Sequence, residues 1–170
     1  MHYILDYLGY IAPIIMAVIS YYLFLGKPIY TNYFFAGLVA NNIINIILKL
    51  LIKEPRPNNE FKKVELAVKH GEYVYFDKFG MPSAHLQNSL YILGYTLFVL
   101  GPTKFSNMII LYIMLVAICG YQRYTSKNHT ILQIGIGSVI GFIVAIITYF
   151  FASKQVKGQI EEKQDDNGPL

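Results

Sequence analysis

Three short polar segments of the chain contain the residue types that could bind and cleave a phosphate group. They are residues 49–57, 82–85 and 122–133. Each lies beside a long apolar run and combines a cation or a hydroxyl with proline, histidine or glutamine. Arginine and lysine neutralise phosphoryl oxygens, and histidine can act as a nucleophile or as a general acid. The chemistry therefore depends on whether the fold brings the three segments together.

The first segment ends a predicted helix beside two cations. Lys49 lies inside the end of an apolar run, and Arg56 is bracketed by Pro55 and Pro57. Proline stops a helix and fixes the direction of the chain that follows. Taken alone, the segment also fits two interfacial cations whose charged ends reach water beside a membrane helix.

The second segment, Pro82-Ser83-Ala84-His85, directly precedes another apolar run. Proline near a helix start leaves the free N–H groups of its neighbours pointing outward. We expect the N–H groups of Ser83 and Ala84 to bind an anion with help from the helix dipole, and Ser83 to add a hydroxyl. The alternative is a helix cap beside an incidental histidine.

The third segment contains Arg123, then His129, then Gln133 on the helical face of His129. The alternative is a short polar loop between two helices. Together, three cations and helix N-terminal amides suit a phosphate dianion, and two histidines supply a nucleophile and an acid. Because the chain has no dense carboxylate or Cys/His ligand set, we expect neither a metal ion nor another cofactor.

The composition indicates how these segments are positioned. Of 170 residues, 55% are hydrophobic and 14% are charged. Five uncharged runs of 18 to 24 residues stand out, and a helix needs about 20 residues to cross a membrane. We predict an all-α integral membrane bundle of five transmembrane helices: residues 7–26, 30–51, 84–101, 104–122 and 129–152. Five buried helices in a soluble protein would leave too little polar surface.

Alternation of the five spans places the three polar segments on one membrane face, together with the N-terminus. Gly101-Pro102-Thr103 predicts a tight turn between the third and fourth helices. We predict one transmembrane domain over residues 1–152, with a polar active-site loop over residues 53–81, and a disordered polar tail over residues 153–170. Three glycines in the last span would permit close helix contact: Gly135, Gly137 and Gly141.

The order and spacing of the segments resemble the type 2 phosphatidic acid phosphatase superfamily, which shares a helical core with vanadium haloperoxidases. The motifs of that superfamily are K-x6-R-P, P-S-G-H and S-R-x5-H-x3-D. Here they read Lys49-x6-Arg56-Pro57, Pro82-Ser83-Ala84-His85 and Gln122-Arg123-x5-His129-x3-Gln133. The resemblance covers about residues 30–152, and the stretches IKEPRP and FGMPSAHLQN are most similar to the dolichyl-diphosphatase branch. It implies a haloperoxidase-like phosphatase core.

The resemblance also implies a role for each motif residue. Five residues would bind the phosphoryl oxygens: Lys49, Arg56, Ser83, Ala84 and Arg123. His129 would attack phosphorus and form a phosphohistidine, His85 would protonate the leaving oxygen, and water would hydrolyse the intermediate. Gln133 would orient His129 in place of the aspartate of the family.

Three positions depart from the family motifs. Ala84 replaces a glycine, which costs little where φ is negative, and Gln122 replaces a serine. Gln133 can accept the N–H of His129 but cannot offset the positive charge that grows as His129 is phosphorylated. We expect a rate loss of roughly 10–10³ unless another carboxylate substitutes. Three carboxylates lie on that face: Glu54, Glu72 and Asp77.

The sequence therefore predicts a phosphatase that hydrolyses a lipid phosphate or diphosphate of the polyprenyl diphosphate or phosphatidate type. Its partners would be this lipid and the surrounding membrane lipids, without nucleic acid, and the oligomeric state is left open. The resemblance implies a multi-pass protein of the endoplasmic reticulum or another internal or cell membrane. The site would face the lumen or the extracytoplasmic side.

Two other functions fit parts of the pattern. Gln133 would suit a weakened or inactive family member that binds lipid head groups or has a structural role. A small channel is the third class of function, and its pore would be lined by amide side chains. These are Asn41, Asn42, Asn45, Gln87 and Asn88. The same side chains could instead form hydrogen bonds between helices.

Overall fold

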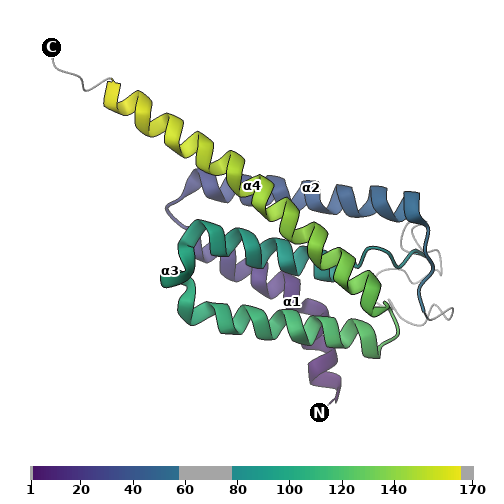
Figure 1. The fold of residues 1–170 in the computed structure, drawn as a ribbon. Helices are drawn as coiled ribbons and strands as arrows, with labels where there is room; N and C mark the ends of the chain where they lie inside the picture. The colour runs from purple at the N-terminus through teal and green to yellow at the C-terminus, as the bar shows by residue number, and fades with distance from the viewer. Residues whose placement is uncertain (1, 58–77, 166–170) are drawn as a thin grey trace, which may run out of the picture.

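The computed structural model describes residues 2–57 and 78–165 as a helical bundle (Figure 1). Four helices follow one another: α1 (His2–Leu23), α2 (Pro28–Ile52), α3 (Ala84–Thr125) and α4 (Ile131–Asp165). These two ranges contain no β-strand, apart from an isolated bridge between Pro55 and Phe79. The protein therefore has the all-α fold that the sequence predicts.

Glycine and proline set the turns between the helices. Pro28 begins α2, where its fixed φ and missing N–H are tolerated. Gly101 has φ of 73° and ψ of 161° and lies within α3, and only glycine adopts such angles without a Cβ penalty. As a result, α3 consists of two legs that run antiparallel in Figure 1. The turn predicted at this position is confirmed.

Four helical segments are long and apolar enough to cross a membrane: Ile4–Leu23, Pro28–Ile52, Met108–Thr125 and Ile131–Glu161. The first leg of α3, the predicted span 84–101, is not among them in the described part of the chain. No residue from 84 to 100 is exposed, and Gln87, Ser89 and Thr96 are buried there. Because α3 contacts all three other helices, this leg can carry polar groups that lipid would not tolerate. Four of the five predicted spans are thus apolar helices, and the remaining one, residues 84–101, is an enclosed and more polar leg.

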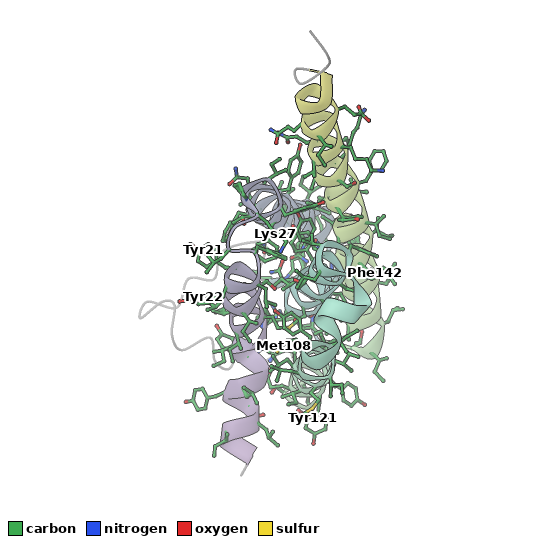
Figure 2. All side chains as sticks on the ribbon, turned by 90° about the vertical axis from the view of Figure 1, so that its left-hand side faces the viewer. Tyr21, Tyr22, Lys27, Met108, Tyr121 and Phe142 are labelled. Carbon is green, nitrogen blue, oxygen red and sulfur yellow. The ribbon has the colours of Figure 1, made fainter. Side chains whose placement is uncertain are left out.

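The outer surface of the bundle is apolar. Tyr22 is 64% exposed, Tyr121 is 60% exposed and Leu132 is 62% exposed. Figure 2 shows Tyr21 and Tyr22 projecting away from the helices. Extensive exposed apolar surface is unfavourable in water and suits contact with lipid. These are the features of a membrane protein.

An amide network joins α2 to the first leg of α3. Asn45 Nδ2 donates to Gln87 Oε1 at 2.7 Å, and Gln87 Nε2 donates to Asn41 Oδ1 at 2.9 Å. Asn41 donates to Asn88 Oδ1 at 2.7 Å, and Asn88 donates to Asn42 Oδ1 at 3.0 Å. The five side chains satisfy one another, which favours interhelical bonding over a pore lining.

Close contact at two glycines positions the start of α4 against the start of α3. A Cβ added at Gly137 would lie 2.6 Å from the carbonyl oxygen of Ser83, and one at Gly141 would clash with the carbonyl of Gln87. A Cβ at Gly135 would have no neighbour within 4 Å in the described part of the chain. The expected close contact therefore involves two of the three glycines.

Helix α4 continues past the predicted span. Residues 153–165 are helical, so the prediction of disorder from residue 153 is wrong for this part of the tail. The stretch SKQVKGQIEEKQD is rich in Lys, Gln and Glu, which are good helix formers, and it extends an existing helix without a nucleation cost. Residues 166–170, and residues 58–77 of the predicted loop, lie outside the described residues.

Candidate active site

Four helix termini meet at one end of the bundle: the end of α2, both ends of α3 and the start of α4 (Figure 1). They carry the three polar segments of the sequence. The charges of Lys49, Arg56 and Arg123 act on the imidazoles of both His85 and His129. The structure therefore brings the three predicted cations and the two predicted histidines into one cluster.

Lys49 is held between the segments that follow α2 and precede α3. Its side chain is 3% exposed, and Nζ donates to the carbonyl oxygen of Phe79 at 3.0 Å. Gly80 donates its N–H to the carbonyl of Glu54 at 2.8 Å, and Pro55 forms the bridge with Phe79. These backbone bonds fix the ammonium group beside the start of α3.

Ser83 precedes α3 and does not use its side chain as a helix cap. Its N–H donates to the carbonyl of Gln133 at 3.1 Å, and Asn45 holds the preceding Pro82 carbonyl at 3.2 Å. The Ser83 side chain is 0% exposed, and its Oγ has no hydrogen-bond partner among the residues that the structure describes. A buried unpaired hydroxyl costs about 1–3 kcal/mol. The Ser83 hydroxyl is therefore an unsatisfied hydrogen-bond donor within the described part of the chain.

Ala84 and His85 form the first turn of α3, and Arg56 lies in the short segment after α2. All three residues are half-buried. Ala84 does not have a positive φ, so an alanine fits the position of the motif glycine without backbone strain.

Helix α1 adds a residue that the sequence did not identify. The Arg123 guanidinium lies 5.1 Å from the centroid of the Tyr10 ring, and that ring is 5.3 Å from the ring of His85. Arg123 is 5% exposed, and its Nε donates to Gln122 Oε1 at 2.6 Å. Gln122 and Tyr10 therefore position the cation. Tyr10 had no distinguishing signal because it is one of many aromatic residues in apolar runs.

His129 lies in the loop between α3 and α4. The sequence predicted a helix from residue 129, whereas α4 begins two residues later, at Ile131. It is 3% exposed, and its N–H donates to the carbonyl of Arg123 at 3.2 Å. Its ring Nδ1 is 2.8 Å from the carbonyl oxygen of Gly80 and 3.3 Å from Gln133 Oε1. Because both neighbours are oxygens, Nδ1 carries the proton and Nε2 carries the lone pair. This tautomer is the one that a nucleophile at Nε2 requires.

The surroundings of His129 keep its imidazole neutral. Burial, followed by the charges of Arg56, Lys49 and Arg123, lowers the pKa of His129 to about 2. The hydrogen bond to Gly80 opposes this shift. The uncharged imidazole is therefore the form present at neutral pH, and burial is the main cause.

Gln133 connects the start of α4 to three other parts of the site. Its Oε1 accepts from the N–H of Thr130 at 3.2 Å, and its N–H donates to Thr130 Oγ1 at 3.2 Å. This reciprocal pair is a capping box. Gln133 Nε2 donates to Glu54 Oε1 at 2.8 Å and to the Pro55 carbonyl at 3.0 Å. Of the three carboxylates expected near the site, Glu54 is therefore placed beside Gln133, and the other two lie outside the described residues.

An open groove of about 580 Å³ borders His129. Its wall includes Pro57, Lys127, Ile131 and Leu132. Ile131 and Leu132 also belong to the apolar outer surface, where they are 69% and 62% exposed. The groove therefore connects the imidazole with the surface that suits lipid.

Residues 30–157 match the family model of the PAP2 superfamily, and this range contains all three polar segments. The chain belongs to the PAP2 superfamily. No curated protein and no solved structure matches the chain. Membership supports a phosphatase-type function for this PAP2 protein. The similarity to the dolichyl-diphosphatase branch stays a prediction from the motif sequences.

Proposed function

We propose that this PAP2 protein is a metal-independent phosphatase that hydrolyses a lipid phosphate or diphosphate through a phosphohistidine. One arrangement carries the proposal: the charges of three cations act on the neutral His129 imidazole, and the buried hydroxyl of Ser83 belongs to a residue bonded to the backbone of Gln133. Cations and the hydroxyl would bind phosphoryl oxygens, and the Nε2 lone pair would face phosphorus. The roles of Lys49, Arg56 and Ala84 in holding the phosphate belong to the same proposal.

The reaction would proceed in two displacements. In the first, Nε2 of His129 bonds to phosphorus, the bond from phosphorus to the leaving oxygen breaks, and His85 gives that oxygen a proton. In the second, water attacks the phosphohistidine, His85 takes a proton from it, and the nitrogen–phosphorus bond breaks. The dianionic substrate supplies the negative charge that a protonated His85 requires beside three cations.

The substrate would approach from the bilayer. The groove beside His129 has apolar walls at Ile131 and Leu132, so an acyl or polyprenyl chain would lie there while its phosphate meets the cations. Polyprenyl diphosphate and phosphatidate both have this combination of groups. We propose, on the basis of the family resemblance, that the site faces the lumen or the extracytoplasmic side of an internal or cell membrane.

A substrate panel tests this proposal. Purified protein in detergent is incubated with polyprenyl diphosphate, phosphatidate and a water-soluble phosphate ester, and released phosphate is measured. We expect release from a lipid substrate that is abolished in His129→Ala and unchanged by a chelator of divalent cations. Release that persists in His129→Ala, or that is lost with the chelator, would contradict the mechanism.

A further inference from the structure

We propose that Glu54 acts through Gln133 as the carboxylate of the His129 nucleophile. A chain of carboxylate, amide and imidazole would then replace the single aspartate of the family motif. The inference rests on the proposed function, because it concerns the residue that would attack phosphorus. It explains how a PAP2 site can operate with a neutral side chain at position 133.

The contacts of Gln133 use the full hydrogen-bonding capacity of its amide. Nε2 donates to Glu54 Oε1 at 2.8 Å and to the carbonyl of Pro55 at 3.0 Å. Oε1 faces the N–H of Thr130 at 3.2 Å and Nδ1 of His129 at 3.3 Å. An amide has two N–H groups and two lone pairs, so each position has one partner.

Glu54 therefore selects the orientation of the amide. If the Gln133 amide rotated by half a turn, its oxygen would face the oxygens of Glu54 and Pro55, and its N–H groups would face those of Thr130 and His129. The observed orientation presents a second oxygen to Nδ1 of His129, beside the Gly80 carbonyl oxygen at 2.8 Å, and both favour the proton on Nδ1 and the lone pair on Nε2.

Glu54 also supplies the charge that Gln133 lacks. As the nitrogen–phosphorus bond forms, the His129 ring gains positive charge, and the Glu54 carboxylate lies one amide group away. At an effective dielectric constant of about 20, the attraction between two charges separated by one amide group corresponds to about a 50-fold effect on rate. The amide between them is polarised in the same direction.

The backbone at Gly80 holds both ends of this chain of contacts. Its N–H donates to the carbonyl of Glu54 at 2.8 Å, and its own carbonyl oxygen lies 2.8 Å from Nδ1 of His129. A Cβ added at Gly80 would lie 2.5 Å from Gln133 Oε1. Glycine at this position is therefore what allows the Gln133 amide to lie between Glu54 and His129.

Exchange of the carboxylate and the amide provides the test. Glu54→Gln keeps the acceptor oxygen and the side-chain size but removes the charge, so kcat should fall about 50-fold while KM changes by less than about threefold. Gln133→Glu puts two carboxylates in contact and should lower kcat at least as much. The double variant restores one carboxylate and one amide and should recover kcat to within about fivefold of the wild type. A purely structural contact predicts no loss in E54Q, because the hydrogen bond survives.

A second measurement is independent of turnover. The ring N–H proton of His129, assigned by its loss in His129→Ala, is followed by NMR in the full-length protein. It should move upfield in E54Q and stay unchanged in Glu161→Gln, which removes an exposed carboxylate of α4. If the wild type releases no phosphate but the resonance moves, the proposed function fails and the contact through Gln133 stands. If the wild type is active and E54Q keeps both its kcat and its resonance, the role of Glu54 is overturned.

Discussion

Replacement of Ser83 by alanine should raise the stability of the protein while it weakens phosphate binding. Ser83 Oγ is fully buried and unpaired within the described part of the chain, and it makes no cap hydrogen bond. Removal of such a hydroxyl relieves a desolvation cost, so the free energy of unfolding should rise by about 1 kcal/mol.

The magnitude of the binding loss follows from the charge of the ligand. A hydrogen bond to a charged group contributes about 1.5–3 kcal/mol, which corresponds to a dissociation constant for inorganic phosphate that is roughly 10- to 150-fold higher. The assay is unfolding of the detergent-solubilised protein, measured alone and over a range of phosphate concentrations. Phosphate release from the lipid substrate is measured in parallel, and kcat/KM should fall by a similar factor.

A matched control is available in α3, about two turns beyond Ser83. Ser89 is also 0% exposed, but its Oγ donates to the carbonyl of His85 at 2.8 Å. Ser89→Ala should therefore leave phosphate binding within about twofold of the wild type and give no gain in stability. If Ser83→Ala instead lowers stability and binds phosphate as tightly as the wild type, the hydroxyl is not a ligand of the anion.

Two further predictions concern His129 and Gly80. The pKa of His129 is about 2 in the folded protein and about 6.5 in an unfolded chain, so the unfolded state takes up the proton first as the pH falls. Between pH 6.5 and about 4, this group should reduce stability by about 1.4 kcal/mol per pH unit. Chemical denaturation should show that His129→Asn removes this component, and an identical slope in that variant would refute the assignment. Gly80→Ala would place its Cβ 2.5 Å from Gln133 Oε1 and should lower kcat at least about tenfold. As a control, the Cβ of Gly135→Ala meets no described atom within 4 Å, so this variant should keep the kcat of the wild type. Equal kcat in the two variants would count against the position of Gln133.

The sequence predicts the helices and the clustering of the site because both depend on simple patterns. Long uncharged runs define the apolar helices, and alternation of the helices places Lys49, Arg56 and Arg123 at one end. Gly101 is also predictable as a turn, because glycine followed by proline is a strong local signal. The limits of the first leg of α3 are predicted well, but its enclosure is not, because enclosure depends on which helices pack around it.

The finer geometry of the site depends on contacts between distant parts of the chain. Glu54 and Gln133 are far apart in sequence, and their bond depends on the backbone bridge between the segments after α2 and before α3. Tyr10 reaches Arg123 only because α1 packs against α3. The helical tail was missed for a different reason: low hydrophobicity suggested disorder, whereas Lys, Gln and Glu also extend a helix that already exists.

The fold changes what Gln133 indicates about the activity of the protein. In the sequence, Gln133 suggests a weakened enzyme because a carboxylate is missing. In the structure, its Nε2 contacts Glu54 at 2.8 Å while its Oε1 faces His129. The Glu54 carboxylate therefore lies beside the position where the family aspartate is missing. The absence of a carboxylate at residue 133 is then a weaker reason to expect an inactive protein.

Detection of the covalent intermediate tests the central claim most directly. The protein is mixed briefly with a lipid substrate whose terminal phosphate is isotopically labelled, quenched in alkali and digested for mass spectrometry. We predict an alkali-stable, acid-labile phosphate on the peptide that contains His129, formed and consumed during turnover. Hydrolysis of the substrate without label on His129, or with label on another residue, would contradict the account.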